Sequence, residues 1–283
     1  MSERTESVRA GERRLSPTSE RHLSPTAVRS GGLAPMLLQQ ARSEFTKLWR
    51  IPMFSIPTLV FPVLLFLLFG APNAQETLPG GVSLGKYVMA SFAAYGVLGI
   101  AFFSFGIGVA SERGQGWTKL VRATPVPPWV YFAGKGAMAL LFATLLLIML
   151  FSVAALVAGV RMAPAEWATL YVTLVLGMLP LVTAGFALGY WAGPNSAAAV
   201  ANLIYLPVSF ASGFLIPLQS LPSFVQAFTP YLPPYHYGQL AWRAVGLDDG
   251  QPGVHVAWLL GSGLVFGALA VWGYRRDNGK QFG

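Results

Sequence analysis

Six long apolar segments dominate this chain and constrain its fold more than any other feature of the sequence. Each is close to the roughly 20 residues that an α-helix needs to cross the hydrocarbon core of a bilayer. A helix satisfies its own backbone hydrogen bonds there, which an open strand cannot do. The sequence therefore predicts an all-α, polytopic membrane protein with six transmembrane helices, at about residues 51–69, 87–110, 132–159, 168–192, 196–217 and 254–274.

Composition separates this prediction from the alternative, a large soluble helical domain. Hydrophobic residues make up 54% of the chain and charged residues 11%, whereas about 25% of a soluble domain is charged. So few charges could not cover the surface of a soluble core. The chain contains no cysteine, which excludes a disulfide, a thioether-linked haem and a thiolate metal site.

The basic residues are unevenly distributed, and their positions predict the orientation of the protein. Of the 19 lysines and arginines, nine fall in residues 1–50, four in 111–135 and three in the last nine residues. The positive-inside rule places such segments in the cytoplasm. We therefore expect a protein of the cytoplasmic membrane of a prokaryote, surrounded by lipid, with both termini cytoplasmic. The net charge of +8 reflects this topology and does not indicate nucleic-acid binding.

Both ends of the chain are predicted to lie outside the hydrocarbon. Residues 1–34 are charged and rich in serine, threonine and proline, which predicts a disordered cytoplasmic tail without the apolar core of a secretory signal. Between 34 and 52, apolar residues at helical spacing oppose a basic face, which predicts an amphipathic helix at the membrane interface. The membrane domain is then 35–276, and 277–283 form a cytoplasmic end.

The stretch 111–129, SERGQGWTKLVRATPVPPW, interrupts the apolar pattern between the second and third segments. A charged residue at the centre of a span costs about 2.5–3.5 kcal/mol, so its four charges would cost roughly 10–14 kcal/mol inside the membrane. We therefore predict a cytoplasmic elbow. Its charged residues are Glu112, Arg113, Lys119 and Arg122.

Residues 218–245 form an unusual connection before the last span. Prolines interrupt this stretch too often for it to cross the membrane, yet it is too aromatic for a free loop. Aromatic rings with polar tips favour the headgroup region. The stretch is therefore predicted to form two short re-entrant helices in the outer leaflet.

No catalytic or metal site is predicted. The three histidines, His22, His236 and His255, do not have the spacing of metal ligands beside a carboxylate. An intramembrane protease would need Ser212 or Ser262 to meet a histidine at membrane depth, whereas His255 lies at the end of its span. The chain also lacks a phosphate-binding P-loop, so any ATP and magnesium would be bound by another chain.

An ion-coupled secondary carrier or channel is the main alternative to a transporter that ATP drives. Such a protein would hold ionisable residues in the middle of its spans. Here the candidates lie near the ends of the predicted spans, where snorkelling of the side chain to the interface accounts for them. They are Lys86, Lys135, Glu166 and His255.

Glycines at every fourth position predict close contact between helices. Gly185, Gly189 and Gly193 follow one another in the fourth span, and Gly263 and Gly267 repeat the spacing in the sixth. Small residues at this spacing let two helices approach closely in lipid. The contact could lie within the chain, which is favoured, or between subunits.

Over about residues 36–276 the chain resembles the ABC-2 type transporter permeases. The resemblance rests on LLQQARSEFTKLWRIP, on the elbow, and on the proline-rich stretch that begins at SGFLIPLQ. In the elbow, Trp117 departs from the family's pattern, which has a threonine-like residue there. The matching positions are Glu112, Arg113, Gly116, Lys119, Leu120, Thr124 and Pro125.

This resemblance implies two six-span subunits, the second a copy or a paralogue, each bound by a separate ABC ATPase that holds ATP and magnesium. It implies that the elbow couples the ATPase to the spans, through the seven matching residues together with Arg122. It also implies an export path between the subunits for an amphipathic, drug-like or lipid-linked cargo. The expected path residues are Thr58, Phe61, Phe102, Phe105, Asn202, Tyr205 and Phe210.

Overall fold

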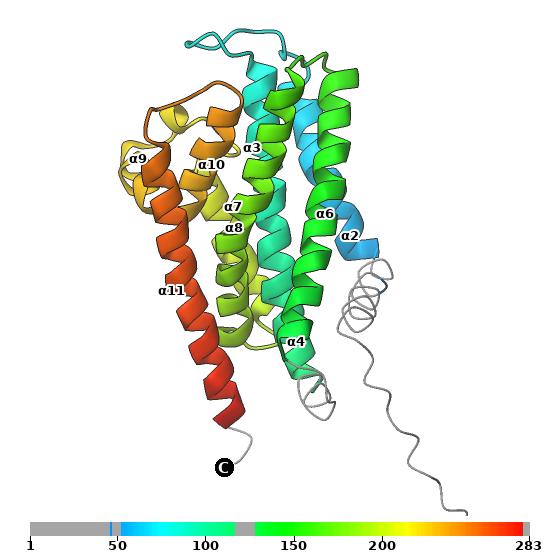
Figure 1. The fold of residues 1–283 in the computed structure, drawn as a ribbon, viewed down its shortest axis with the longest axis vertical. Helices are drawn as coiled ribbons and strands as arrows, with labels where there is room; N and C mark the ends of the chain where they lie inside the picture. Colours follow the sequence, from blue (N-terminus) through cyan, green and yellow to red (C-terminus); the bar gives the residue numbers. More distant parts are fainter. Residues whose placement is uncertain (1–45, 47–51, 117–127, 280–283) are drawn as a thin grey trace, which may run out of the picture.

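The computed structural model describes residues 46, 52–116 and 128–279 (Figure 1). This part of the chain is mostly helical and contains no strand, apart from an isolated bridge between Thr77 and Ser83. The prediction of an all-α protein is therefore confirmed. The predicted tail and nearly all of the predicted interfacial helix lie outside the described residues.

Four helices are long and apolar enough to cross a membrane, and they correspond to the second, third, fourth and sixth apolar segments. Two shorter apolar helices, Thr58–Gly70 and Ala197–Ala211, correspond to the first and the fifth. The membrane assignment is thus supported, and the count of six spans stays a prediction. The four long helices are Leu84–Gly114, Val130–Leu156, Pro164–Trp191 and Pro252–Asp277.

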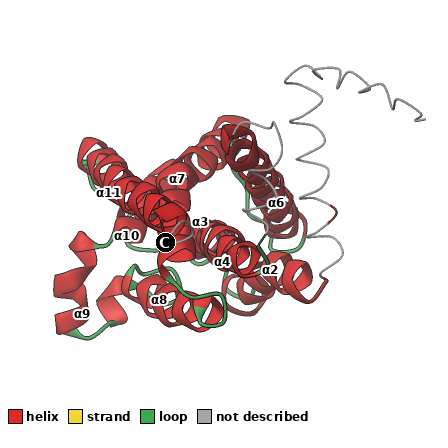
Figure 2. Ribbon diagram, turned by 90° about the horizontal axis from the view of Figure 1, so that it is seen from below, coloured by secondary structure: helices red, strands yellow, loops and turns green. Residues whose placement is uncertain are grey.

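The second apolar segment lies at the centre of the bundle and is a continuous run of three helical pieces (Figure 2). They are α3 (Leu84–Ile100), the π-helix η2 (Ala101–Ile107) and α4 (Gly108–Gly114). Nearly all of α3 is buried, as expected for a helix that is apolar on every side. A π-helix inside a span often marks a functional position.

Two helices pack on one side of α3, and two others run along a different side of the bundle. The first two are α2 (Pro52–Leu65), which the π-helix η1 (Phe66–Gly70) continues, and α6 (Pro128–Leu156). The others, α7 (Pro164–Trp191) and α11 (Pro252–Gly279), lie side by side over most of their length (Figure 1).

The predicted packing glycines of α7 lie against η2 of the same chain. A Cβ atom at Gly189 would lie 2.8 Å from Phe105 O, and one at Gly185 would overlap Ala101 O. Gly193 differs, because it follows the end of α7 and an added Cβ there would meet only Ser196 Oγ at 3.3 Å. Within the described part of the chain, Gly193 therefore brings no second helix close, and its role in helix packing stays a prediction.

The fifth helix, α8 (Ala197–Ala211), is shorter than predicted and packs mainly on η2. It ends at Ala211 rather than near 217, because Gly213 adopts a positive φ of 82° and redirects the chain. Glycine tolerates this left-handed conformation without steric cost. The next side chain, Phe214, turns back into the core, where it is 2% exposed.

The stretch 218–245 contains two short α-helices that differ in burial, and their location in the outer leaflet stays a prediction. Phe224 and Phe228 of the first are exposed, whereas the second is tied into the bundle. Tyr237 Oη donates to Leu174 O at 2.8 Å, and Trp242 Nε1 donates to Ser91 Oγ at 2.8 Å. The elements are η3 (Leu218–Ser220), α9 (Ser223–Phe228), η4 (Thr229–Tyr231) and α10 (Pro233–Ala244).

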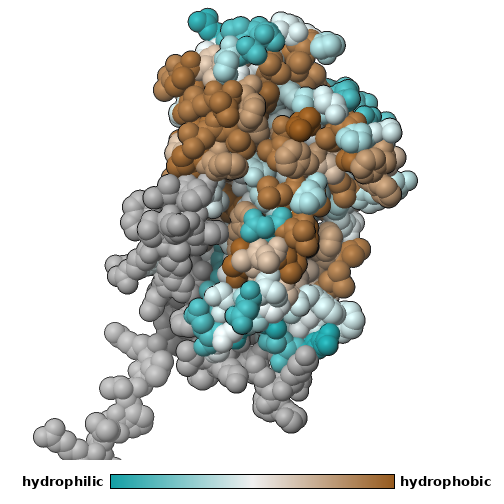
Figure 3. All heavy atoms as spheres, turned by 180° about the vertical axis from the view of Figure 1, so that it is seen from behind, coloured by the Kyte–Doolittle hydropathy of each residue, from teal (hydrophilic) through white to brown (hydrophobic). Residues whose placement is uncertain are grey.

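The two ends of the bundle differ from its middle. Figure 3 shows hydrophobic side chains over the middle of one face and hydrophilic ones gathered at both ends. We refer to the end with the C-termini of α4 and α11 as the α4 end, and to the other as the α10 end (Figure 1).

Candidate functional site

Glu112 and Arg113, near the start of the elbow, are tied to the bundle at the α4 end by side-chain hydrogen bonds. The carboxylate of Glu112 accepts hydrogen bonds from Tyr131 Oη and, at 3.0 Å, from Lys135 Nζ, both on α6. Lys135 is only 6% exposed. Snorkelling does not account for this lysine, contrary to the prediction, because its charge is neutralised within the protein by Glu112.

Arg113 makes the most extensive polar contacts at this end. Its Nη1 lies 2.7 Å from Gly189 O and 3.0 Å from Tyr190 O, so it donates to carbonyls at the C-terminus of α7. Its Nη2 donates to Asp277 Oδ1 of α11 at 2.7 Å, and its Nε donates to Oδ2 at 3.2 Å. A bidentate pair of this kind fixes both partners in orientation. The positive charge also complements the negative end of the α7 dipole.

These contacts join four elements that are far apart in sequence. Glu112 connects α4 to α6, while Arg113 connects α4 to both α7 and α11. Both ion pairs are largely buried, so the loss of one partner should lower the free energy of unfolding by about 3–5 kcal/mol. A displacement of the elbow would therefore be transmitted to three helices. We refer to Glu112, Arg113, Tyr131, Lys135 and Asp277 as the α4 node.

The rest of the predicted coupling set falls at or beyond the limit of the described chain. Gly116 adopts a φ of 73°, a left-handed conformation that favours glycine and turns the chain away from α4. The remaining members, which lie outside the described residues, are Lys119, Leu120, Arg122, Thr124 and Pro125.

The predicted path residues fall into two groups. Phe105 and Tyr205 are buried, and Tyr205 Oη donates to Tyr95 O at 2.9 Å. Asn202 is exposed on α8, where its amide donates to Ala198 O of the preceding turn at 2.9 Å. Phe102 also belongs to the buried group, while Phe61 and Phe210 are exposed and Thr58 is half-buried.

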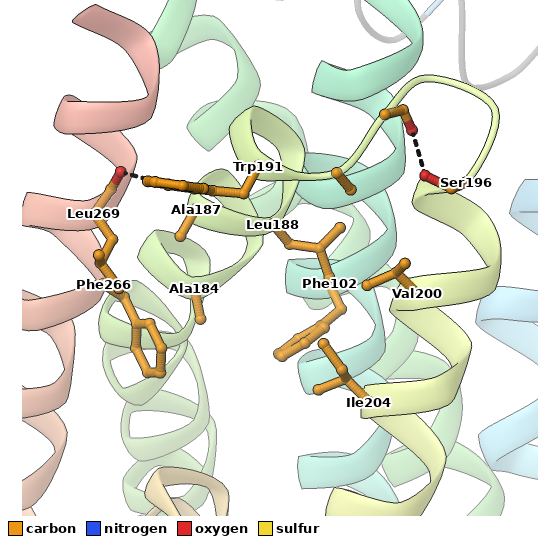
Figure 4. A pocket seen from close by; sticks show the side chains of 12 residues that line it. Phe102, Ala184, Ala187, Leu188, Trp191, Ser196, Val200, Ile204, Phe266 and Leu269 are labelled. Atoms are coloured by element: carbon orange, nitrogen blue, oxygen red, sulfur yellow. Dashed lines mark hydrogen bonds between the residues drawn. The ribbon is translucent and has the colours of Figure 1, made fainter. Parts of the chain in front are cut away.

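An apolar cavity of about 600 Å³ lies beside the buried group (Figure 4). Phe102 of η2 and Ile204 of α8 line one side, and Phe266 of α11 lines the other. Trp191 of α7 also lines the cavity and donates from Nε1 to Leu269 O at 3.0 Å. The sequence predicted Phe102 as a path residue but not this cavity, because its walls come from four separate elements.

A second polar cluster, which the sequence did not predict, lies at the α10 end. His236 Nδ1 and His255 Nδ1 are 2.7 Å apart, and His255 Nε2 is 2.7 Å from Asp249 Oδ2. The three residues lie on α10, α11 and the intervening loop, so their spacing in sequence gave no sign of their contact. We refer to His236, His255 and Asp249 as the histidine cluster.

A metal site or a serine protease site among the described residues would require a particular arrangement of side chains. No group of three or more His, Cys, Asp or Glu side chains within the described ranges is arranged to hold a metal ion. Ser262 Oγ donates to Leu259 O at 2.9 Å, and Ser212 Oγ is buried without a hydrogen-bond partner. Neither serine contacts His255, so the described residues provide no Ser–His pair.

Two comparisons with known proteins both point to a transport permease. A family model described as ABC-2 type transporter matches residues 37–245. The putative transport permease YvfS of Bacillus subtilis (strain 168) is 25% identical to this chain over 211 residues, which cover 74% of this chain and 85% of the relative. The match to the family model includes the elbow and α10.

Proposed function

Because this chain belongs to the ABC-2 type transporter family, we propose that it is the membrane half of an ATP-driven exporter. Two copies, or one copy and a paralogue, form the transporter, and a separate ATPase binds ATP and magnesium. The ATPase docks on the elbow, residues 111–129, at the cytoplasmic end of a six-span bundle. Its hydrolysis of ATP drives the export of an amphipathic, drug-like or lipid-linked cargo across the cytoplasmic membrane.

The α4 node is the observation that carries this proposal. An elbow that only linked two spans would need no buried ion pairs, whereas one that receives a force needs rigid connections to the helices it moves. Arg113 provides them through Asp277 and the α7 carbonyls at 2.7 Å. Glu112 adds α6. In this mechanism both residues position the elbow, and the segment beyond Gly116 makes the contact with the ATPase.

The position of the proposed path rests on the exposed side chains of α2 and α8. Figure 2 shows both helices on the side of α3 that faces away from α7. Phe61, Asn202 and Phe210 are exposed on these two helices. An exposed amide is costly against lipid tails but compatible with a wet cavity between two subunits. The apolar cavity beside Phe102 would suit a cargo with little charge.

The test uses Arg113 and a matched arginine at the other end of the bundle. Arg113→Gln should lower ATP-driven export of a hydrophobic fluorescent dye by about tenfold, the equivalent of about 1.4 kcal/mol of coupling, while ATP hydrolysis continues. Arg243→Gln is the control, because Arg243 pairs with Asp248 at 3.3 Å in a half-exposed setting. Its export should remain close to that of the wild type.

The measurement is made in proteoliposomes that contain the full-length protein and its ATPase, with and without vanadate. Export that vanadate abolishes supports the proposal. Transport that proceeds without any ATPase, driven by a proton or sodium gradient, would overturn it in favour of the ion-coupled carrier.

A further inference from the structure

The histidine cluster joins two elements that the backbone alone does not hold together. His236 lies in the first turn of α10, and His255 lies in the first turn of α11. Both side chains are almost fully buried, at 3% and 5% exposure. Their contact therefore fixes α10, and with it α9, against the beginning of the last span.

The partners of the outer nitrogens determine how many protons the two rings carry. His236 Nε2 lies 2.9 Å from Pro230 O, which can only accept, so this nitrogen carries a proton. His255 Nε2 lies 2.7 Å from the Asp249 carboxylate and carries a second proton. Burial alone would raise the pKa of Asp249, but hydrogen bonds from Gln251 N–H and His255 lower it, which keeps this carboxylate charged.

The contact between the inner nitrogens then requires one further proton. At 2.7 Å, His236 Nδ1 and His255 Nδ1 form a hydrogen bond only if one donates and the other accepts. If neither Nδ1 carried a proton, two lone pairs would face each other. If both Nδ1 atoms carried one, two N–H groups would collide. Three protons on four nitrogens give the pair a charge of +1, which Asp249 balances. We propose that the histidine cluster is a binding site for one proton and that this proton latches α10 onto α11.

The surroundings of the cluster are consistent with a single positive charge. Trp258 of α11 stacks on His236, with ring centroids 5.1 Å apart and planes inclined by 10°, an arrangement that favours a cationic ring. Tyr235 also contacts both histidine rings through its edge or face. The helices α3 and α7 also pack on α10. Their charged residues at this end, Lys86 and Glu166, neutralise each other in an ion pair of 3.4 Å.

In acid, a fourth proton would bind to the pair, so that both inner nitrogens carry a proton and the contact between α10 and α11 should break. Burial lowers the pKa of His236 below its ordinary value, and the charge of His255 lowers it further, against the opposing effects of the Pro230 carbonyl and Asp249. The unfolded chain takes up a proton there at about pH 6.5, whereas the folded protein resists it. Stability therefore falls as the pH drops below about 6.5. Loss of the shared proton in alkali should also open the contact, because both inner nitrogens would then be acceptors.

The proton count can be tested on the unmodified full-length protein. With ¹⁵N-labelled histidine in lipid nanodiscs, NMR near neutral pH should find both Nε2 atoms of the buried pair protonated and one proton shared by the two Nδ1 atoms. If both rings are instead neutral, with neither Nδ1 protonated, the proposal is wrong. This measurement needs neither a cargo nor an ATPase, so it is independent of the proposed export.

The latch itself can be tested by distance measurements, because the chain has no cysteine to interfere with labelling. Phe228 of α9 and Leu260 of α11 are exposed, at 67% and 58%. Spin labels at Phe228→Cys and Leu260→Cys should give one narrow distance near neutral pH and a broader or longer one at about pH 5. His255→Gln cannot titrate and should remove this pH dependence.

His22→Gln provides the matched control, since His22 lies outside the described residues and outside the cluster. It should leave the pH response of the doubly labelled protein unchanged. An equal pH response in the wild type and in His255→Gln would overturn the latch. So would the absence of any change in the wild type.

Discussion

At the scale of single residues, two lysine–glutamate ion pairs of similar N–O distance should differ widely in their contribution to the free energy of unfolding. Lys135 and Glu112 are 3.0 Å apart and buried, whereas Lys86 and Glu166 are 3.4 Å apart and much more exposed. Lys135→Met should lower the free energy of unfolding by about 3–5 kcal/mol, because it removes a buried cation that donates to the Glu112 carboxylate. Lys86→Met, the control, should lower the free energy of unfolding by less than about 1 kcal/mol.

The double variant Lys135→Met with Glu112→Gln makes this prediction sharper. Removal of both charges should recover much of the lost stability, with a coupling energy of about 1–3 kcal/mol in a double-mutant cycle. Steric trapping in nanodiscs would measure it. Additive losses would show that the two side chains do not stabilise each other.

The residue scale also shows where inference from sequence ends. Glu112 and Arg113 were predicted from a local motif, but their partners were not. Asp277 is 164 positions from Arg113, and the two histidines of the cluster are 19 positions apart. Such contacts depend on how the helices meet, and no periodicity within one segment reveals them.

At the scale of elements, the contact between α7 and η2 depends on the absence of a side chain at Gly185. A Cβ atom there would overlap Ala101 O, a backbone atom that cannot rotate away. Gly185→Ala should therefore force α7 and η2 apart and cost about 1–3 kcal/mol. Gly136→Ala is the control, because an added Cβ on α6 meets nothing within 4 Å and alanine favours a helix. Thermal unfolding of both variants in detergent compares the two costs, and equal melting temperatures would contradict the prediction.

The elements themselves were largely predictable, because hydropathy and proline positions are local properties. Each apolar segment corresponds to a helix of the described fold, whereas most of the interruption at 111–129 lies outside the described residues. The π-helix η2 was not foreseen, since Ala101–Ile107 has no pattern that distinguishes it from the rest of an apolar helix. The early end of α8 was also missed, because a glycine such as Gly213 is common in membrane helices and stops a helix only in particular surroundings.

At the scale of the whole molecule, the remaining question is how the chain crosses the membrane. The loops at Asn73 and Gln251 lie at the α10 end, whereas Gln115 and Asn195 lie at the α4 end, and all four side chains are exposed. The positive-inside rule predicts that the α4 end lies in the cytoplasm, because Arg275 and Arg276 are at this end together with the start of the elbow. If α2 and α8 both cross, these loops must alternate between the two sides of the membrane.

Single cysteines in this cysteine-free chain can decide both the orientation and the count of six spans. Asn73→Cys and Gln251→Cys should react with a membrane-impermeant maleimide in intact spheroplasts, while Gln115→Cys and Asn195→Cys should react only after lysis. The Asn195 site is the most informative, because α8 has only 15 residues and spans about 22 Å as a helix, less than the roughly 30 Å of the hydrocarbon core. The segment from Gly213 onward, with η3, must complete that crossing. If Asn195→Cys is labelled from outside, the hairpin between α7 and α8 does not lie on the cytoplasmic side. This result would contradict the six-span topology.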